Sequence, residues 1–174
     1  MDFRTTSLCD ANEKEIGLTI QISNPVFKHF GRRDAFHGQI VTLKLFEDNV
    51  LLREAASERG QGRVLVVDVG ATSHCGVIGD MIAELAHLND WQGVVLNGYV
   101  RDSVALGKVD IGVYALGTYP QRSGKKGLGE RDVPVTFWGI NYKPGDYLYC
   151  DKDGLMVSAH PLLGEVAAGS SFHQ

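Results

Sequence analysis

Two stretches of the chain are apolar at consecutive positions, which is the pattern of strands that are covered on both faces. They run from Arg63 to Val69 and from Gly93 to Asn97. Parallel strands packed between two layers show this pattern. Between the two stretches, apolar residues recur at helical spacing after Gly79 and stop near Asn89. The sequence therefore predicts a strand-helix-strand unit.

Weaker patterns predict further elements around this unit. Asp48 is a candidate N-cap for a helix whose apolar face includes residues 50–56 and which ends at Gly60-Gln61-Gly62. The other expectations are a helix over 6–17, strands over 40–46 and 111–116, a loop over 117–131, and antiparallel strands over 133–138, 147–150 and 155–158, the last two joined by a turn at 151–154. We expect one α/β domain over residues 1–158 and a flexible tail over 159–174.

Composition limits the classes of function. A chain of 174 residues with 44% apolar and 22% charged residues fits one globular domain. Its net charge of -4 makes direct binding of nucleic acid unexpected. Because no apolar run approaches about 18 residues and the start lacks a signal-peptide layout, we expect a cytoplasmic protein without membrane contact. Cys9, Cys75 and Cys150 have no metal or redox spacing and are expected to be reduced and inert.

The predicted topology brings candidate chemistry to one edge of the sheet, where ligands of open α/β sheets bind. The helix start at Gly79, Asp80, Met81 and Ile82 offers unpaired backbone N–H groups, which favour a carboxylate or phosphate. Just beyond the second strand, Arg101 offers a fork of donors for a carboxylate or an enolate oxygen. Asp102 offers the hard oxygen that Mg²⁺ or Mn²⁺ prefers. Together these groups fit a small α-keto acid.

Other interpretations stay open on these residues alone. Asp102 could cap a short helix over 103–106 while Arg101 makes a surface ion pair. The segment 123–129 is rich in Gly and Lys but lacks the spacing of a phosphate loop, so we interpret it as a solvated basic loop. The histidines show no ligand spacing, and no serine lies in the context of a nucleophile elbow.

Longer strings of residues resemble the RraA-like family, which includes 4-hydroxy-4-methyl-2-oxoglutarate aldolases. They occur in the family's order and spacing from about residue 5 to residue 158, at 46–49, 62–68, 91–102, 110–113, 125–130 and 145–154. The resemblance implies a swivelling β/β/α three-layer fold. It also implies a homotrimer with sites near the subunit boundaries.

The resemblance implies roles as well. In the aldolase branch the amides of Gly79 to Ile82 hold the substrate carboxylate, Arg101 contacts the keto or enolate oxygen, and Asp102 binds the divalent metal. The reaction is the cleavage of 4-hydroxy-4-methyl-2-oxoglutarate to two pyruvates, with oxaloacetate decarboxylation as a related activity. Both reactions leave the pyruvate enolate, so the same positive groups serve both.

One position departs from the aldolase pattern. That pattern continues after Arg-Asp with an acidic residue thought to steady the metal through water, where this chain has Ser103-Val104 followed by Ala105. Loss of such a carboxylate weakens metal binding or activity by about 10 to 100-fold. The alternative is therefore a non-catalytic regulator of the RraA type that binds a ribonuclease or an RNA helicase. A keto-acid binding protein without turnover is a third interpretation.

Overall fold

The structure is a computed structural model that describes residues 2–164. Its centre is the predicted unit, formed by β4 (Val64–Asp68), α3 (Asp80–Leu88) and β6 (Gly93–Val100), with β4 and β6 parallel. Leu65 and Val67 of β4 belong to the core that includes α2, α3 and α4, whereas Val64 and Val66 face a second core on the other side of the sheet. The prediction of a strand covered on both faces is confirmed.

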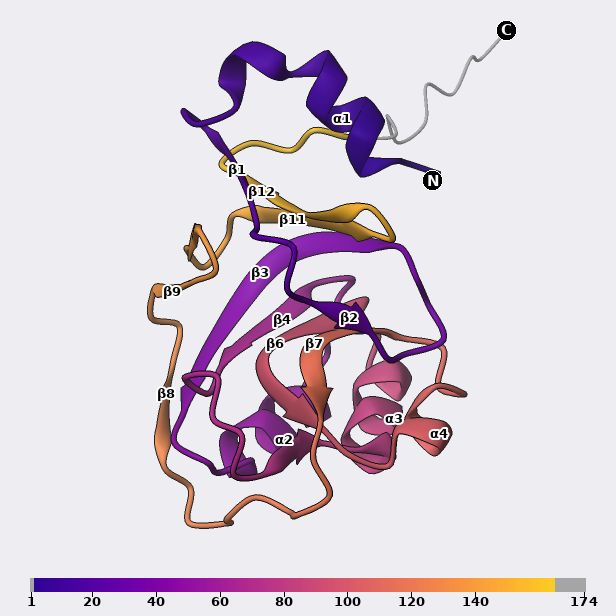
Figure 1. The fold of residues 1–174 in the computed structure, drawn as a ribbon, viewed down its shortest axis with the longest axis vertical. Coiled ribbons are helices and arrows are strands. Elements are labelled where there is room, and N and C mark those ends of the chain that lie inside the picture. The colour runs from indigo at the N-terminus through magenta and orange to yellow at the C-terminus, as the bar shows by residue number, and fades with distance from the viewer. Residues whose placement is uncertain (1, 165–174) are drawn as a thin grey trace, which may run out of the picture.

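β3 (Phe36–Leu45) connects two sheets and is longer than predicted. Residues 40–44 pair in parallel with β4, whereas residues 36–39 pair with β11 (Tyr147–Asp151) in the antiparallel direction. The antiparallel side continues through β12 (Gly154–Ser158) and β1 (Ile20–Ile22). Figure 1 shows these strands above the parallel sheet and α2, α3 and α4 below it. The three layers are thus sheet, sheet and helices, which confirms the β/β/α expectation.

The remaining elements complete these layers: α1 (Thr5–Ala11), a 3-10 turn (Glu13–Glu15), β2 (Lys28–His29), α2 (Val50–Ser57), β5 (Gly76–Ile78), α4 (Ser103–Leu106), β7 (Gly112–Thr118), β8 (Gly129–Arg131), β9 (Val135–Phe137) and β10 (Ile140–Tyr142). Because β3 belongs to both sheets, hydrogen-bonded neighbours form one continuous path, β1-β12-β11-β3-β4-β6-β7-β2, with β5 beside β6 and β8 beside β3. Within residues 2–164, no helix is long and apolar enough to cross a membrane.

Some boundaries differ from the predictions. The helix expected over 6–17 ends at Ala11, because the side chain of Asn12 donates to the Leu8 carbonyl at 2.8 Å and the backbone leaves the helical conformation. The loop expected over 117–131 contains β8. Residues 159–164 follow β12, and the amide of Leu162 donates to the Tyr149 hydroxyl at 2.7 Å. Residues 165–174 of the expected tail lie outside the described residues.

A close approach explains two glycines in neighbouring strands. Gly93 of β6 and Gly112 of β7 are cross-strand partners, and the ring of Phe36 lies over both. A Cβ atom would stand 2.4 Å from this ring at Gly93 and 2.0 Å from it at Gly112. Side chains at these positions would displace Phe36, which is only 1% exposed. Glycine is therefore required where the two sheets meet.

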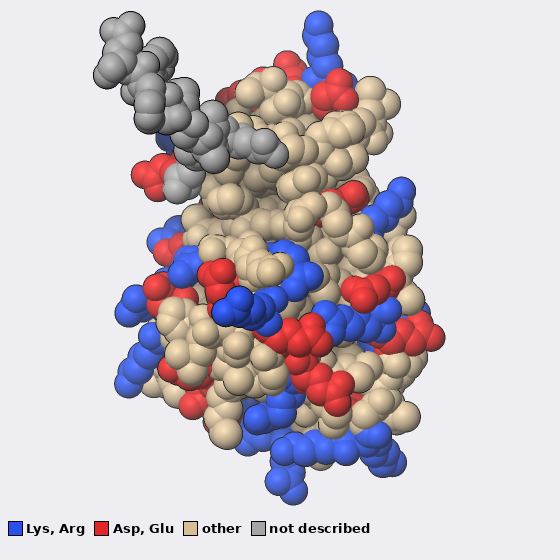
Figure 2. Space-filling view, turned by 180° about the vertical axis from the view of Figure 1, so that it is seen from behind, with Lys and Arg blue, Asp and Glu red and all other residues tan. Residues whose placement is uncertain are grey.

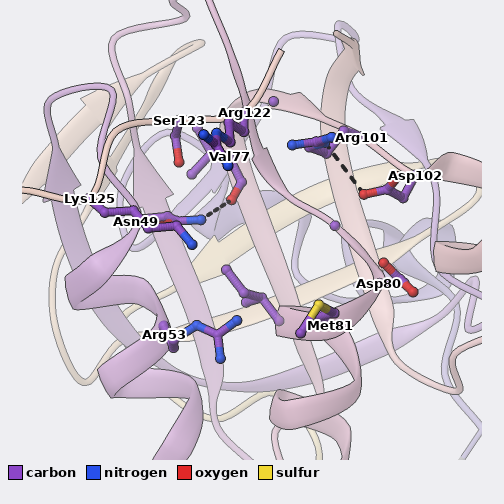
Figure 3. A pocket seen from close by; sticks show the side chains of 13 residues that line it. Asn49, Arg53, Val77, Asp80, Met81, Arg101, Asp102, Arg122, Ser123 and Lys125 are labelled. Atoms are coloured by element: carbon purple, nitrogen blue, oxygen red, sulfur yellow. Dashed lines mark hydrogen bonds and ion pairs between the residues drawn. The ribbon is translucent and has the colours of Figure 1, made fainter. Parts of the chain in front are cut away.

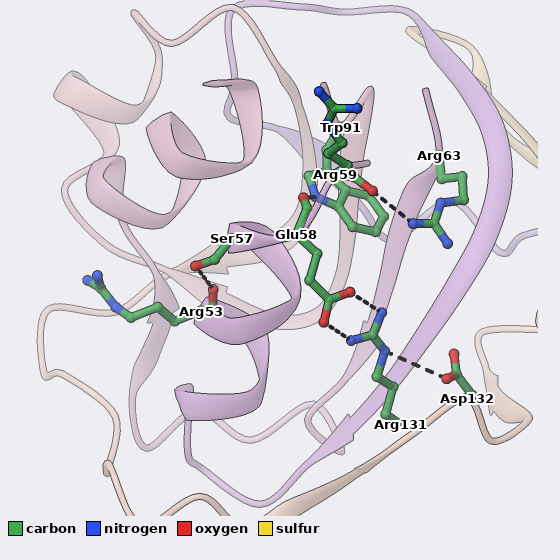
Figure 4. Close-up of polar contacts among 8 residues, drawn as sticks. All are labelled: Arg53, Ser57, Glu58, Arg59, Arg63, Trp91, Arg131 and Asp132. Carbon is green, nitrogen blue, oxygen red and sulfur yellow. Dashed lines mark hydrogen bonds and ion pairs between the residues drawn. The ribbon is translucent and has the colours of Figure 1, made fainter. Parts of the chain in front are cut away.

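Polar contacts fix the far end of α2, whose near end reaches the candidate site. Arg131 of β8 donates two hydrogen bonds to Glu58, at 2.7 and 2.8 Å, just after the helix ends (Figure 4). The indole of Trp91 donates to the Glu58 carbonyl at 3.0 Å, and Arg63 stacks on the same ring. These contacts tie α2 to β8 and to the start of β6.

Candidate functional site

Arg101 and Asp102 lie directly after β6, at the edge of the sheet that the topology predicted. The amide of Arg101 donates to the Ile78 carbonyl at 2.8 Å, so β5 holds its backbone from one side. The sequence pattern missed β5, which has only three residues. At Gly76 of β5, a Cβ atom would lie 2.5 Å from the Tyr119 carbonyl and 2.8 Å from Arg101 Cβ. Glycine is needed there for the Arg101 backbone to approach.

The carboxylate of Asp102 does not cap α4, although the sequence had left that interpretation open. Asp102 stands at the N-cap position of α4 in the left-handed conformation (φ 52°, ψ 41°), but its side chain makes no cap hydrogen bond. It lies 3.4 Å from Arg101 Nε, and half of the side chain is exposed. A Cβ atom at Gly79 would lie 2.9 Å from Asp102 Oδ2. The carboxylate is thus placed against the start of α3.

The start of α3 has the features of an anion site. Gly79 is its N-cap residue, and no side chain caps the first turn. The first N–H groups of a helix have no partner within the helix, and the macrodipole adds positive potential there. All six predicted site residues line one pocket of about 230 Å³, together with further residues that the sequence analysis did not assign to a site: Asn49, Arg53, Gly76, Val77, Arg122, Ser123 and Lys125.

Charge is unevenly distributed around this pocket. Figure 3 shows the carboxylates of Asp80 and Asp102 on one side and Arg53, Arg122 and Lys125 on the other. In the view of Figure 2, basic side chains gather at the lower end of the molecule, where Figure 1 places the loop between β7 and β8. Four basic and two acidic residues line the pocket when Arg101 is included. The pocket therefore favours an anion with more than one negative group.

The basic loop is solvent-exposed at Lys125 and Lys126, as predicted, but it also lies against the pocket, which Lys125 lines. The cause is Asp48, which is 1% exposed and accepts hydrogen bonds from the amides of Lys126 and Gly127 as well as from Val50 at 3.0 Å. Burial alone would raise the pKa of Asp48, but these backbone hydrogen bonds outweigh it and the pKa is lowered. Asp48 precedes the N-cap residue Asn49 and joins α2 to the loop.

The donor set fits a divalent cation that keeps part of its water shell. Among residues 2–164, no three His, Cys, Asp or Glu side chains are grouped as a complete set of metal ligands. The pocket offers the carboxylates of Asp80 and Asp102 on the same side. Mg²⁺ is commonly held by one or two carboxylates, with water and substrate oxygens completing the shell. Among the residues that line this pocket, Asp102 and Asp80 are the carboxylates that could hold such a cation.

Comparison with known proteins places the chain in a family. The sequence model of the RraA-like family, described as Aldolase/RraA, matches residues 5–157. The chain belongs to the RraA-like family. The resemblance found in the sequence is thereby confirmed, and the matched segment contains every residue of the predicted site.

RraA-like relatives carry different functional names. A protein of Dechloromonas aromatica (strain RCB), named "Putative 4-hydroxy-4-methyl-2-oxoglutarate aldolase", is 50% identical over 93% of this chain and 99% of its own length. The structure of the RNA-processing inhibitor RraA from Thermus thermophilis superposes with a TM-score of 0.87 at 40% identity, covering 96% of this chain and 98% of that one. A Geobacillus kaustophilus HTA426 structure, described as S-adenosylmethionine: 2-dimethylmenaquinone methyltransferase, has a TM-score of 0.87 at 39% identity, over 92% and 97%. The fold is shared, so the function must be argued from the site.

Proposed function

We propose that this RraA-like protein is a divalent-metal-dependent lyase that cleaves 4-hydroxy-4-methyl-2-oxoglutarate to two pyruvates. The observation that carries the proposal is the convergence of three groups on one pocket: the uncapped start of α3, Arg101 and Asp102. An anion site, a cationic donor and a metal-binding carboxylate are what cleavage to an enolate requires. The name of the 50% identical relative supports the same activity.

The head of the substrate is a 2-oxo carboxylate. Its carboxylate is placed at the amides that open α3, where the helix dipole favours negative charge. Its keto oxygen is placed toward Arg101, whose Nε is buried and lacks a hydrogen bond of good geometry within the described part of the chain. Arg101 is thus free to donate to the oxygen that becomes negative as the carbon-carbon bond breaks. One such donor is worth about 3 kcal/mol of barrier.

The acidic side of the pocket is assigned to the metal. When it is bound at Asp102, with Asp80 beside it, Mg²⁺ or Mn²⁺ supplies Lewis-acid stabilisation of the same developing charge. Gly79 leaves room for the Asp102 carboxylate, because a Cβ atom there would lie 2.9 Å from Oδ2 and the carboxylate would have to move. Both aspartates would act as ligands, and Asp102 also keeps Arg101 oriented through its 3.4 Å contact with Nε.

The basic side of the pocket is assigned to the far end of the substrate. A 2-oxo dicarboxylic acid carries a second carboxylate several bonds from the first, and Arg53, Arg122 and Lys125 stand across the pocket from Asp80 and Asp102. Charge attraction there favours dianionic substrates over pyruvate itself. Oxaloacetate has the same two ends, so its decarboxylation is proposed as a second activity.

The test is the release of pyruvate from 4-hydroxy-4-methyl-2-oxoglutarate and from oxaloacetate, with Mg²⁺ or Mn²⁺ and with a chelator. Activity that requires the metal and is abolished by the chelator is expected. Ala105 lies exposed on α4, one turn after Asp102, and Ala105→Glu is expected to lower the metal concentration needed. No release by either protein in excess Mn²⁺ would defeat the enzymatic proposal.

The second candidate function is regulation of a ribonuclease or RNA helicase through protein contact. Its support is the likeness to the RNA-processing inhibitor RraA at 40% identity. This candidate predicts that neither substrate is turned over and that the protein binds and inhibits a ribonuclease in a pull-down and cleavage assay. If the Asp102→Asn variant still binds the ribonuclease, the surface that binds the ribonuclease is distinct from the proposed catalytic site.

A further inference from the structure

Ser123 is a buried polar residue of the pocket that no contact explains. Its side chain is 93% buried (7% exposed), and Oγ has no hydrogen-bond partner among residues 2–164. Figure 3 shows the hydroxyl pointing from its loop toward the interior of the pocket. A buried hydroxyl without a partner is destabilising. Of the buried side-chain atoms without a partner among the described residues, those of Ser123 and Arg101 belong to residues that line this pocket. The hydroxyl is therefore available to a bound molecule.

The loop that carries Ser123 is held in place on both sides. The amide of Gly124 donates to the Glu47 carbonyl at 2.8 Å, and the Asn49 amide donates to the Gly124 carbonyl at 3.3 Å. Two residues further on, the buried Asp48 carboxylate accepts the amides of Lys126 and Gly127. These bonds make the loop an extension of the β3–α2 connection. Ser123 is thus presented from a fixed backbone, as a group that determines specificity must be.

The surroundings of Ser123 indicate which part of a ligand it meets. It lies between Arg122 and Lys125 in sequence, on the basic side of the pocket and across from Asp80 and Asp102 (Figure 3). The 2-oxo carboxylate of the proposed substrate occupies the α3 and Arg101 side. A substrate oxygen beside Ser123 therefore belongs to the far end of the substrate. Because Arg122 and Lys125 surround this position, the chemical group that fits there is a carboxylate.

We propose that Ser123 is a specificity-determining residue that donates a hydrogen bond to the second carboxylate of a 2-oxo dicarboxylic acid, and that Asp48 is the residue that positions it. The inference rests on the proposed function and adds the group that selects the substrate class. Lys125 and Arg122 are exposed and supply charge attraction, whereas the buried Ser123 hydroxyl on a fixed backbone selects by position. A fixed hydroxyl stays unpaired when pyruvate is bound, and a site built to pair a substrate group disfavours the analogue that lacks it.

The experiment compares two ligands that cannot undergo the aldol cleavage. 2-Oxoglutarate has both carboxylates but no hydroxyl at C4, and pyruvate has only the 2-oxo carboxylate. Their dissociation constants are measured by calorimetry with Mg²⁺ on the full chain. Ser123→Ala is expected to weaken 2-oxoglutarate binding by about tenfold, the loss of one hydrogen bond to a charged group, and to leave pyruvate binding unchanged. Ser123→Thr keeps the hydroxyl and is expected to retain most of the selectivity.

A loop variant outside the pocket serves as the control. Gln121 is exposed and does not line this pocket, so Gln121→Ala is expected to change neither affinity. Asp48→Asn is expected to lower selectivity for 2-oxoglutarate as Ser123→Ala does. In a variant with both Ser123→Ala and Asp48→Asn, the two losses of 2-oxoglutarate affinity should not add. Asp48→Asn alone already releases the loop and displaces the Ser123 hydroxyl. Additive losses would overturn the positioning role of Asp48.

The outcomes separate this inference from the function on which it rests. If Ser123→Ala weakens both ligands equally, or neither, while the unmodified protein binds them, the inference about Ser123 is wrong and the proposed function stands. If the unmodified protein binds neither keto acid in the presence of Mg²⁺ or Mn²⁺, the proposed function is wrong and the inference is wrong with it.

Discussion

At the scale of single residues, Arg101 and Asp102 show how adjacent positions acquire different chemistry. Arg101 still donates one backbone hydrogen bond to β5, whereas Asp102 turns into the left-handed region and its carboxylate lies against Gly79. An aspartate accepts this backbone conformation more readily than most residues do. The turn therefore separates a fixed cation from a partly exposed carboxylate within two residues.

Substitution of the pair is expected to produce two different defects. Asp102→Asn should raise the Mg²⁺ or Mn²⁺ concentration needed for half-maximal activity, because an amide is a weaker ligand than a carboxylate. Arg101→Lys keeps the charge but loses the planar fork, and it should reduce kcat/KM by an amount equivalent to about 2 to 4 kcal/mol. Metal titrations of initial rates distinguish them. Identical metal dependence of the two variants would argue against separate roles.

Neighbouring lysines provide a matched pair for the basic side of the pocket. Lys125 lines the pocket, whereas Lys126 does not and uses only its backbone amide, toward Asp48. Lys125→Ala is expected to raise KM for the dicarboxylic substrate by the equivalent of about 1 kcal/mol, a small value because the side chain is exposed and screened. Lys126→Ala should leave KM unchanged. Equal effects would indicate long-range attraction instead of contact.

At the scale of elements, short segments decide the geometry of the site. β5 has three residues, yet it fixes the Arg101 backbone, and the loop after β7 brings Ser123 and Lys125 to α2. Asp48 holds both parts of this arrangement with one buried carboxylate. The order of the pocket wall therefore depends on the ionised state of Asp48.

A consequence for pH follows from the lowered pKa of Asp48. Although burial opposes it, hydrogen bonds from backbone amides stabilise the carboxylate in the folded state. Its contribution to stability is fully present above the ordinary value of 3.8 and is lost as the pH falls through the lower folded value. The free energy of unfolding should thus fall more steeply with acid in the unmodified protein than in Asp48→Asn. Urea titrations at a series of acidic pH values test this, and parallel curves would contradict it.

At the scale of the whole molecule, large apolar side chains are exposed on the two helices that begin at the site. On α3 and α4, the exposed fractions are 68% for Met81, 72% for Leu88 and 78% for Val104. Single exposed apolar residues are common, but a site near a subunit boundary would account for these. We propose that the protein assembles as a homotrimer through contacts that include this side of the molecule.

The expected mass in solution is three times the chain mass of 19.0 kDa. Light scattering coupled to size exclusion measures it directly. Leu88→Glu places a charge on α3 outside the pocket and is expected to reduce the trimer fraction if this helix lies at the boundary. A monomer mass for the unmodified protein that does not change with concentration would contradict the assembly.

Local patterns were sufficient for the central part of the fold and for half of the site. The buried strands, α2 and α3 were predicted because apolar periodicity reflects which faces are covered. The handedness of the crossover then placed Gly79 to Ile82 next to Arg101 and Asp102, and all of them line one pocket. Each of these inferences depends on residues close in sequence or on a general rule of topology.

The other half of the site depends on contacts between distant segments. Asn49 and Arg53 lie about 70 residues before Ser123 and Lys125, and no periodicity links the two groups. They meet because the buried Asp48 carboxylate accepts hydrogen bonds from the backbone amides of residues 126 and 127. Every residue except proline has such an amide, so the sequence does not show which amides will bind the carboxylate. Side-chain pattern records burial and local conformation, whereas hydrogen bonds between backbone segments are formed only when the chain has folded.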